Sequence, residues 1–294
     1  MSPQKSERPR EESRIPKPRN SAGRNVPVAI TVGIALAALA LFAVFMGPWL
    51  WYPLLAVVAA MATWEVTRRL REKDWLVPTI PLMVGGQLII WLPWAFGVLG
   101  LVLGLIVTVF AVLVTRLFNN GAAVGPNDWL RDASVGVFIA AWIPTTLSFG
   151  AMLSTLEIDS GVDPRLYIIS FMMCVVASDV GGYAAGVFFG RHPMAPAISP
   201  KKSWEGFAGS MILGITAGIC AALFLIDRPL WFGIAFGISM VLAATLGDLI
   251  ESQFKRDLGV KDMSNLIPAH GGLMDRLDGM LPAATVSWML LVLV

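Results

Sequence analysis

The chain has 294 residues, of which 56% are hydrophobic and only 14% charged, and its mean hydropathy is +0.71. This composition excludes an ordinary soluble globular domain, in which about 45–50% of residues are apolar and about 25% charged. The formal net charge of +2 gives no sign of a nucleic-acid partner, and none is expected.

The first 25 residues are rich in Pro, Ser, Lys, Arg and Glu and almost free of apolar side chains. Seven of them are basic and three are acidic. Such a segment buries too little apolar surface to offset the loss of chain entropy on folding. Residues 1–25 are therefore predicted to form a disordered basic tail on the cytoplasmic side.

Apolar blocks of 16 or more residues follow the tail. About 20 helical residues cross a hydrocarbon core of about 30 Å, and the blocks lack the alternation of a transmembrane β-barrel. The sequence thus predicts an all-α polytopic membrane protein with about nine transmembrane helices. The predicted spans are 26–46, 50–66, 77–94, 96–115, 134–153, 166–189, 206–226, 230–248 and 279–294.

The distribution of basic residues predicts the orientation, because cytoplasmic connections carry an excess of Lys and Arg. With nine crossings and a cytoplasmic N-terminus, 20 of the 22 Lys and Arg residues lie on the cytoplasmic side. Only Arg165 and Arg228 lie outside, together with the C-terminus. Residues 26–165 are predicted to be N-terminal transmembrane helices and residues 166–294 a C-terminal transmembrane region.

The first polar segment begins inside the predicted span 166–189. An ionisable residue at membrane depth is unfavourable by a few kcal/mol, so Asp179 is expected to face the bundle interior or a wet cavity. Tyr183 lies four residues on and shares its helix face. The glycines at 181, 182, 186 and 190 fit close helix packing equally well, and that alternative stays open.

The same segment continues into Ser-Pro-Lys-Lys-Ser, residues 199–203, directly before a new apolar helix. Two hydroxyls (Ser199 and Ser203), two cations (Lys201 and Lys202) and the free backbone N–H groups of a helix start would suit a phosphate. The alternative is a pair of ordinary lysines at the edge of the membrane.

The second polar segment surrounds residues 248–278. Asp248 and Ser252 share one helix face, and Asp275 and Asp278 share another. If the intervening loop folds back, three carboxylates meet at the membrane surface, which is what Mg²⁺ needs in phosphoryl transfer. The cationic or hydrogen-bonding side chains expected around them are Lys255, Arg256, Lys261, His270 and Arg276.

These residues resemble a known family. The positions that follow the long signature of the phosphatidate cytidylyltransferases are Ser252, Lys255, Arg256, Lys261, Asp262, Ser264, Pro268, His270, Gly271, Gly272, Asp275, Arg276 and Asp278. The first segment is similar to that family's Asp-Tyr-Gly and Ser-Pro-Lys-Lys-Thr-Trp-Glu-Gly motifs. Two departures are mild: Gly182 stands where Ala is usual, and Ser203 where Thr is usual. The resemblance covers about residues 178–280.

The resemblance implies an enzyme that converts CTP and phosphatidic acid, a membrane lipid, to CDP-diacylglycerol and pyrophosphate for phospholipid biosynthesis. It implies that Mg²⁺ is required, leaves open a second cation, and suggests a homodimer. It also implies that residues 166–294 are the catalytic region, in a plasma membrane with the active site on the cytoplasmic face.

The resemblance also assigns roles to the polar residues. Asp248, Asp275 and Asp278 would hold the metal and act in catalysis with Lys202. The residues implied in substrate binding are Ser199, Lys201, Ser203, Ser252, Lys255, Arg256, Arg276, Tyr183, Asp179 and His270. Asp179 is placed in the polar cavity without a firm role, and His270 is either a phosphate donor or a residue that orders the loop.

Two other functions are weighed against this one. A secondary transporter also carries intramembrane carboxylates and glycine-rich helices, but here only Asp179 is expected to lie deep. A CTP-dependent transferase acting on another lipid would use the same motifs.

Overall fold

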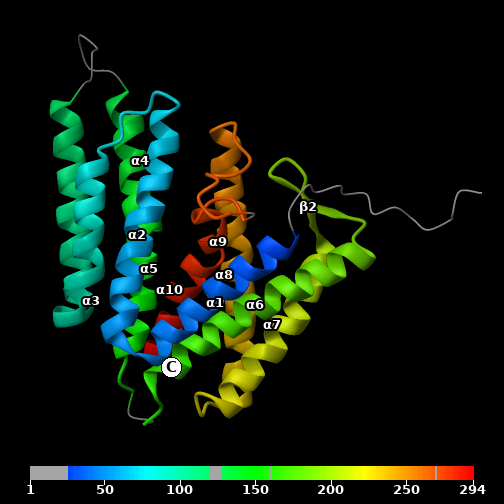
Figure 1. Ribbon diagram of the computed structural model, residues 1–294. Coiled ribbons are helices and arrows are strands. Elements are labelled where there is room, and N and C mark those ends of the chain that lie inside the picture. The colour runs from blue at the N-terminus through cyan, green and yellow to red at the C-terminus, as the bar shows by residue number, and fades with distance from the viewer. Residues whose placement is uncertain (1–25, 120–127, 159–160, 269) are drawn as a thin grey trace, which may run out of the picture.

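The computed structural model describes residues 26–119, 128–158, 161–268 and 270–294. Within these ranges the chain forms α-helices, one short 3-10 helix and one two-stranded hairpin (Figure 1). The all-helical prediction is confirmed except for that hairpin. The predicted disordered tail, residues 1–25, lies outside the described residues.

The N-terminal half contains helices that largely follow the predicted spans. They are α1 (Val26–Phe45), α2 (Pro48–Arg71), α3 (Thr79–Phe118), α4 (Trp129–Trp142) and α5 (Pro144–Met152), followed by the 3-10 helix η1 (Leu153–Thr155). The predicted span 134–153 is divided between α4 and α5 because Pro144 has no N–H with which to continue the helical hydrogen bonds.

Helix α3 covers two predicted spans and is broken between them. Gly97 has φ 54° and ψ −139°, a conformation that glycine adopts without a Cβ clash. The two halves then pack closely, since a Cβ on Gly100 would lie 2.9 Å from the Pro93 nitrogen, and one on Gly104 would lie 3.0 Å from the Ile89 Cα. Figure 1 shows these halves of α3 side by side.

The C-terminal half contains α6 (Pro164–Phe189), α7 (Trp204–Phe224), α8 (Leu230–Asp257), α9 (Met274–Leu277) and α10 (Met280–Leu293). A hairpin of β1 (Pro193–Ala195) and β2 (Ser199–Ser203) connects α6 to α7, and its antiparallel register pairs Pro193 with Ser203. The hairpin was not predicted. Helix α8 extends beyond residue 248, the end of its predicted span, so it carries Asp248 and the charged residues after it on one rigid element.

Small residues let α6 and α7 approach closely. A Cβ on Gly181 would collide with the backbone oxygen of Gly209, and one on Gly182 would lie 2.5 Å from Ser210 Oγ. The close-packing interpretation therefore holds for these two glycines. Ser210 Oγ also donates to the Ser178 carbonyl at 2.7 Å, which links the two helices by a buried hydrogen bond.

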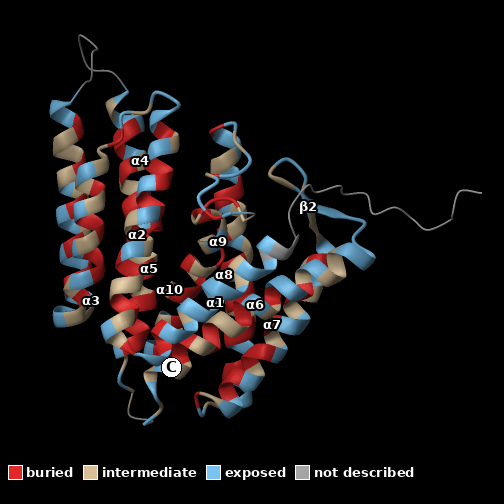
Figure 2. Cartoon of the chain, viewed as in Figure 1, coloured by how far each residue is buried: buried red, intermediate tan, exposed pale blue. Residues whose placement is uncertain are grey.

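In the described ranges, seven helical segments are long and apolar enough to cross a membrane. This number counts the broken α3 once and leaves out α1, whose apolar part, Ile30–Phe45, is shorter. Many residues of these helices are exposed (Figure 2), and large apolar side chains are among them: Phe110 of α3 is 67% exposed and Ile106 is 58% exposed. Such surfaces are suited to lipid. The protein is thus a helical membrane protein, while the nine crossings and their orientation stay predictions.

Candidate active site

A cavity of about 250 Å³ lies between α6, α7, α8 and the hairpin. Asp179 and Tyr183 of α6 both line it, as their shared helix face predicted. Lining residues from the other elements include Ser199, Lys201, Lys202, Ser203, Ser210, Thr245 and Asp248. Tyr183 is 76% exposed, and the Asp179 side chain is also exposed. The first polar segment therefore forms part of the lining of a polar cavity, and the rest comes from α7 and α8.

Lys202 connects the hairpin to α8. Its ammonium group lies 2.7 Å from Asp248 Oδ2 and donates to the Thr245 carbonyl at 3.3 Å. Ser203 is the N-cap of α7, because its Oγ accepts a hydrogen bond from the Gly206 N–H at 3.1 Å. The neighbouring Lys201 is exposed. Both lysines of the motif line the cavity, but they differ in burial: Lys202 is half-buried and paired with Asp248, whereas Lys201 is exposed.

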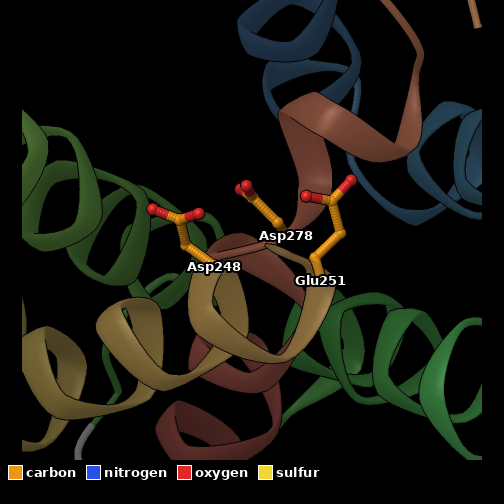
Figure 3. Close-up of side chains that lie close together, drawn as sticks. All are labelled: Asp248, Glu251 and Asp278. Atoms are coloured by element: carbon orange, nitrogen blue, oxygen red, sulfur yellow. The ribbon is translucent and has the colours of Figure 1, made fainter. Parts of the chain in front are cut away.

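Three carboxylates come together beside this cavity. Oxygens of Asp248, Glu251 and Asp278 all lie within 4.8 Å of one another. Figure 3 shows the Asp278 side chain reaching toward the two α8 side chains from the segment that follows α9. The backbones approach so closely because α8 has Gly247 here, where a Cβ would collide with the Asp278 carbonyl and lie 2.6 Å from Pro282 Cγ.

Asp275 lies outside this group of three, although the sequence placed it among the metal residues. Its Oδ2 accepts hydrogen bonds from the N–H groups of Met263 at 3.0 Å and Gly272 at 2.8 Å. Its Oδ1 accepts one from the Lys255 ammonium at 2.8 Å. Both carboxylate oxygens are therefore engaged in holding the loop before α9.

Glu251 occupies the third position instead, and the sequence analysis missed it. It is fully buried, and among the described residues Lys255 is its ion-pair partner. Lys255 thus lies between Glu251 and Asp275. A signal for Glu251 existed in the sequence, since it follows Asp248 by three residues on the same α8 face.

The chemistry of these groups fits a hard divalent cation. Carboxylate oxygens are the ligands that Mg²⁺ prefers, and Mg²⁺ keeps several waters and substrate oxygens in its coordination shell. Asp248 and Asp278 are only partly buried, so they leave room for such ligands. Glu251 is fully buried. The residues that could hold a metal ion are therefore Asp248, Glu251 and Asp278.

The other predicted substrate-binding residues of α8 lie beside this group. Ser252 Oγ donates to Asp248 Oδ1 at 3.2 Å, which confirms only that the two share a face. Arg256 Nε donates to the Ile198 carbonyl at 3.2 Å and so joins the end of α8 to the hairpin turn.

His270 and Arg276 lie in and after the loop that precedes α9. The Arg276 guanidinium donates two hydrogen bonds to the His270 carbonyl, at 3.1 and 2.7 Å. His270 Nδ1 lies 3.3 Å from the Pro268 carbonyl. The Arg276 contacts use the backbone carbonyl of His270, so the role of its imidazole stays a prediction with the two alternatives that the sequence analysis named.

Comparison with known proteins shows to which family the chain belongs. The model of a family described as the cytidylyltransferase family matches residues 27–294. The chain belongs to this family. The match therefore covers the N-terminal helices as well as the two polar segments, where the motif resemblance was confined to about residues 178–280.

Some members of the family are similar over most of the chain and others over a part of it. A phosphatidate cytidylyltransferase of Mycobacterium bovis is 49% identical over 280 residues, which cover 92% of this chain and 90% of the relative. The enzyme of the same name from Mycobacterium leprae is 47% identical over 283 residues, covering 92% and 89%. That of Haemophilus influenzae is 41% identical over 127 residues, covering 40% and 43%.

Proposed function

We propose that the protein transfers the cytidylyl group of CTP to phosphatidic acid, giving CDP-diacylglycerol and pyrophosphate. One observation carries this proposal: Asp248 belongs both to the carboxylate group and, through its ion pair with Lys202, to the polar cavity. Asp248 thus belongs both to the carboxylates that would bind the metal and to the cavity that would bind the phosphates. The relatives named phosphatidate cytidylyltransferase supply the substrate class.

In the reaction, an oxygen of the phosphatidate phosphate attacks the α-phosphorus of CTP in line. A bond forms between that oxygen and the α-phosphorus. The bond from the α-phosphorus to the oxygen that bridges to the β-phosphorus breaks, and pyrophosphate leaves. The lipid phosphate already lies at the membrane surface, so the site has to bring the nucleotide to it.

The cationic side chains of the cavity bind the phosphates in this proposal. The Lys202 ammonium is held by Asp248 at 2.7 Å, in a position to donate to a triphosphate oxygen as a charge-assisted hydrogen bond. Lys201 and the hydroxyls of Ser199 and Ser203 line the same cavity and orient the phosphates. Asp179 and Tyr183 of α6 also line this cavity.

Arg256 and Arg276 both hold the backbone and, in this proposal, bind phosphates. Arg256 and Arg276 both donate to backbone carbonyls, and a guanidinium has five N–H donors, so each keeps donors for a phosphate. Ser252 orients Asp248. Lys255 balances the charges of Glu251 and Asp275.

Asp248, Glu251 and Asp278 would hold Mg²⁺, which when bound neutralises the triphosphate and stabilises charge on the group being transferred. This assignment replaces Asp275, named from the sequence, with Glu251. Asp275 keeps its importance in the proposal because it holds the loop that leads to Asp278.

We place the site on the cytoplasmic face of a plasma membrane, with the N-terminus inside and the C-terminus outside after nine crossings. The skew of 20 out of 22 Lys and Arg residues supports this orientation. In Figure 1 the hairpin lies at the end of the molecule opposite the C-terminus. Arg228, one of the two outside basic residues, donates to the Val294 carbonyl at 3.2 Å.

The first test is pyrophosphate release by the purified protein in detergent micelles with CTP and Mg²⁺, with and without phosphatidic acid. Asp248→Asn and addition of EDTA are run beside it. Release that needs both substrates and is lost with EDTA or in the variant supports the proposal. No release by folded wild-type protein with phosphatidic acid overturns it, and release with another lipid phosphate would move the activity to that lipid.

The family resemblance alone suggests a homodimer, and the mass of the protein in detergent tests it.

A further inference from the structure

A buried carboxylate of the N-terminal half contacts the loop that leads into the site. Glu65 of α2 is 1% exposed. Its Oε1 accepts a hydrogen bond from the Leu273 N–H at 3.3 Å, and its Oε2 accepts one from the Met274 N–H at 2.8 Å. The Ser264 hydroxyl also donates to Oε1. A buried carboxylate is unfavourable unless it is hydrogen-bonded, and these donors satisfy both of its oxygens.

The same face of α2 makes a second attachment to the loop. Arg69 lies one turn after Glu65, and its Nε donates to the Met263 carbonyl. The loop is therefore held at Met263 and Ser264 and again at Leu273 and Met274, all by α2.

Asp275 holds the loop from the other side. Its Oδ2 takes the Met263 and Gly272 N–H groups, while Glu65 takes the next two, those of Leu273 and Met274. The two carboxylates close around Gly272. A Cβ there would collide with Glu65 Oε1 and lie 2.9 Å from Asp275 Oδ2. Glycine is thus needed at 272 because both carboxylates occupy the space of a side chain.

These contacts fix the position of Asp278. It follows Met274 by four residues, about one helical turn, and α9 (Met274–Leu277) connects the two. Fixing the amides of Leu273 and Met274 therefore fixes where the Asp278 carboxylate lies relative to Asp248. Glu65 does not line the cavity at Asp248, so it acts through this segment.

We propose that Glu65 is a positioning residue of the site, which sets Asp278 for metal binding from the N-terminal half of the protein. The role rests on the proposed function, because Asp278 is one of the metal residues there. A residue that served only the stability of the fold would lower the unfolding temperature and leave metal affinity in the folded protein unchanged. A positioning residue changes metal affinity itself.

The variants are Glu65→Gln, which keeps one acceptor oxygen but puts an N–H₂ against one of the donors, and Glu65→Ala, which removes both oxygens. Ser264→Ala removes one donor and leaves Glu65 in place. The matched control is Thr67→Ala: Thr67 is buried in the same helix, and its hydroxyl bonds to the Thr63 and Trp64 carbonyls of α2.

Three quantities are measured in detergent: Mn²⁺ affinity by electron paramagnetic resonance, hydrogen exchange of peptides covering 263–274, and the steady-state kinetics of pyrophosphate release. We expect Glu65→Ala to weaken Mn²⁺ binding by about 10- to 100-fold, the range seen when groups that orient metal ligands are removed. Glu65→Gln should fall between wild type and Glu65→Ala. The apparent KM for Mg²⁺ should rise in parallel, with the KM for phosphatidic acid unchanged and exchange in 263–274 faster.

Unchanged Mn²⁺ affinity and unchanged exchange in folded Glu65→Ala, or an equal loss in Thr67→Ala, overturn the inference. If Glu65→Ala does not fold, Glu65→Gln and Ser264→Ala decide it by the same two measurements. Wild-type protein that binds Mn²⁺ but releases no pyrophosphate with phosphatidic acid contradicts the proposed function instead. In that case Mn²⁺ affinity and exchange still decide the role of Glu65.

Discussion

Asp248 and Asp278 belong to different helical segments, yet their carboxylate oxygens lie within 4.8 Å of each other. The contact depends on Gly247, because α8 passes directly against the backbone of Asp278 at this residue. The site therefore depends on the absence of a side chain as much as on the carboxylates themselves.

Gly247→Ala should lower kcat by on the order of tenfold or more, since displacements of about 1 Å at a reacting centre reduce rates by up to about 100-fold. Alanine favours helix by about 1 kcal/mol over glycine, so the loss would come from the clash with the Asp278 carbonyl. The control is Gly150→Ala in α5, where a Cβ would meet its nearest neighbour at 3.5 Å. Pyrophosphate release measures both, and equal activity of the two variants would contradict the prediction.

Glu251 and Asp275 are distinguished by a metal titration. Glu251→Gln should weaken Mn²⁺ binding by about tenfold or more, because it removes a charged ligand oxygen. Asp275→Asn should mainly speed hydrogen exchange at Met263 and Gly272, since their N–H groups bond to its Oδ2. The assignment of Glu251 fails if Asp275→Asn alone weakens Mn²⁺ binding while Glu251→Gln leaves it unchanged.

Lys202→Ala should raise the apparent KM for CTP by about tenfold or lower kcat by a similar factor, the effect of losing one charge-assisted hydrogen bond. The control is Lys73→Ala, an exposed lysine in the connection after α2. Initial rates over a range of CTP concentrations separate the two constants. Wild-type kinetics in Lys202→Ala would remove this residue from the site.

Breaking the ion pair of Arg116 with Asp132 should lower the stability of the protein without affecting catalysis. Both side chains are 1% exposed, and Arg116 Nη2 lies 3.0 Å from Asp132 Oδ2. Asp132→Asn removes the negative charge that faces a buried guanidinium, so it should lower the free energy of unfolding by about 3–5 kcal/mol. Thermal unfolding in detergent measures the change, with activity retained well below the transition.

Asp128→Asn is the control for that ion pair. Asp128 pairs with Arg131 at 3.1 Å, and the two side chains are 50% and 41% exposed. An exposed pair contributes about 0–1 kcal/mol, so this variant should unfold close to the wild-type temperature. Similar shifts in both variants would show that burial does not decide the strength of these pairs.

Local sequence patterns predict the helices and the position of the polar segments along them. Apolar blocks long enough to cross a membrane become helices because backbone N–H and C=O groups in lipid must be satisfied within the segment. The local spacing of Asp179 and Tyr183 correctly placed both on one wall of the cavity. Ser203 directly precedes the next helix and caps it. These features depend on residues a few positions apart, which the sequence order fixes.

Which carboxylates meet depends on the packing of segments that lie far apart in the chain. Helical spacing places Asp248 and Glu251 on one face and Asp275 and Asp278 on another, but it does not say how the two faces are aligned. That alignment depends on the close approach at Gly247 and on the hydrogen bonds of the loop before α9. These interactions place Asp278 against α8 and turn Asp275 toward Lys255. Glu65 is the clearest case, because its partners lie about 200 positions away in the chain, and only the packing of α2 against the loop brings them together.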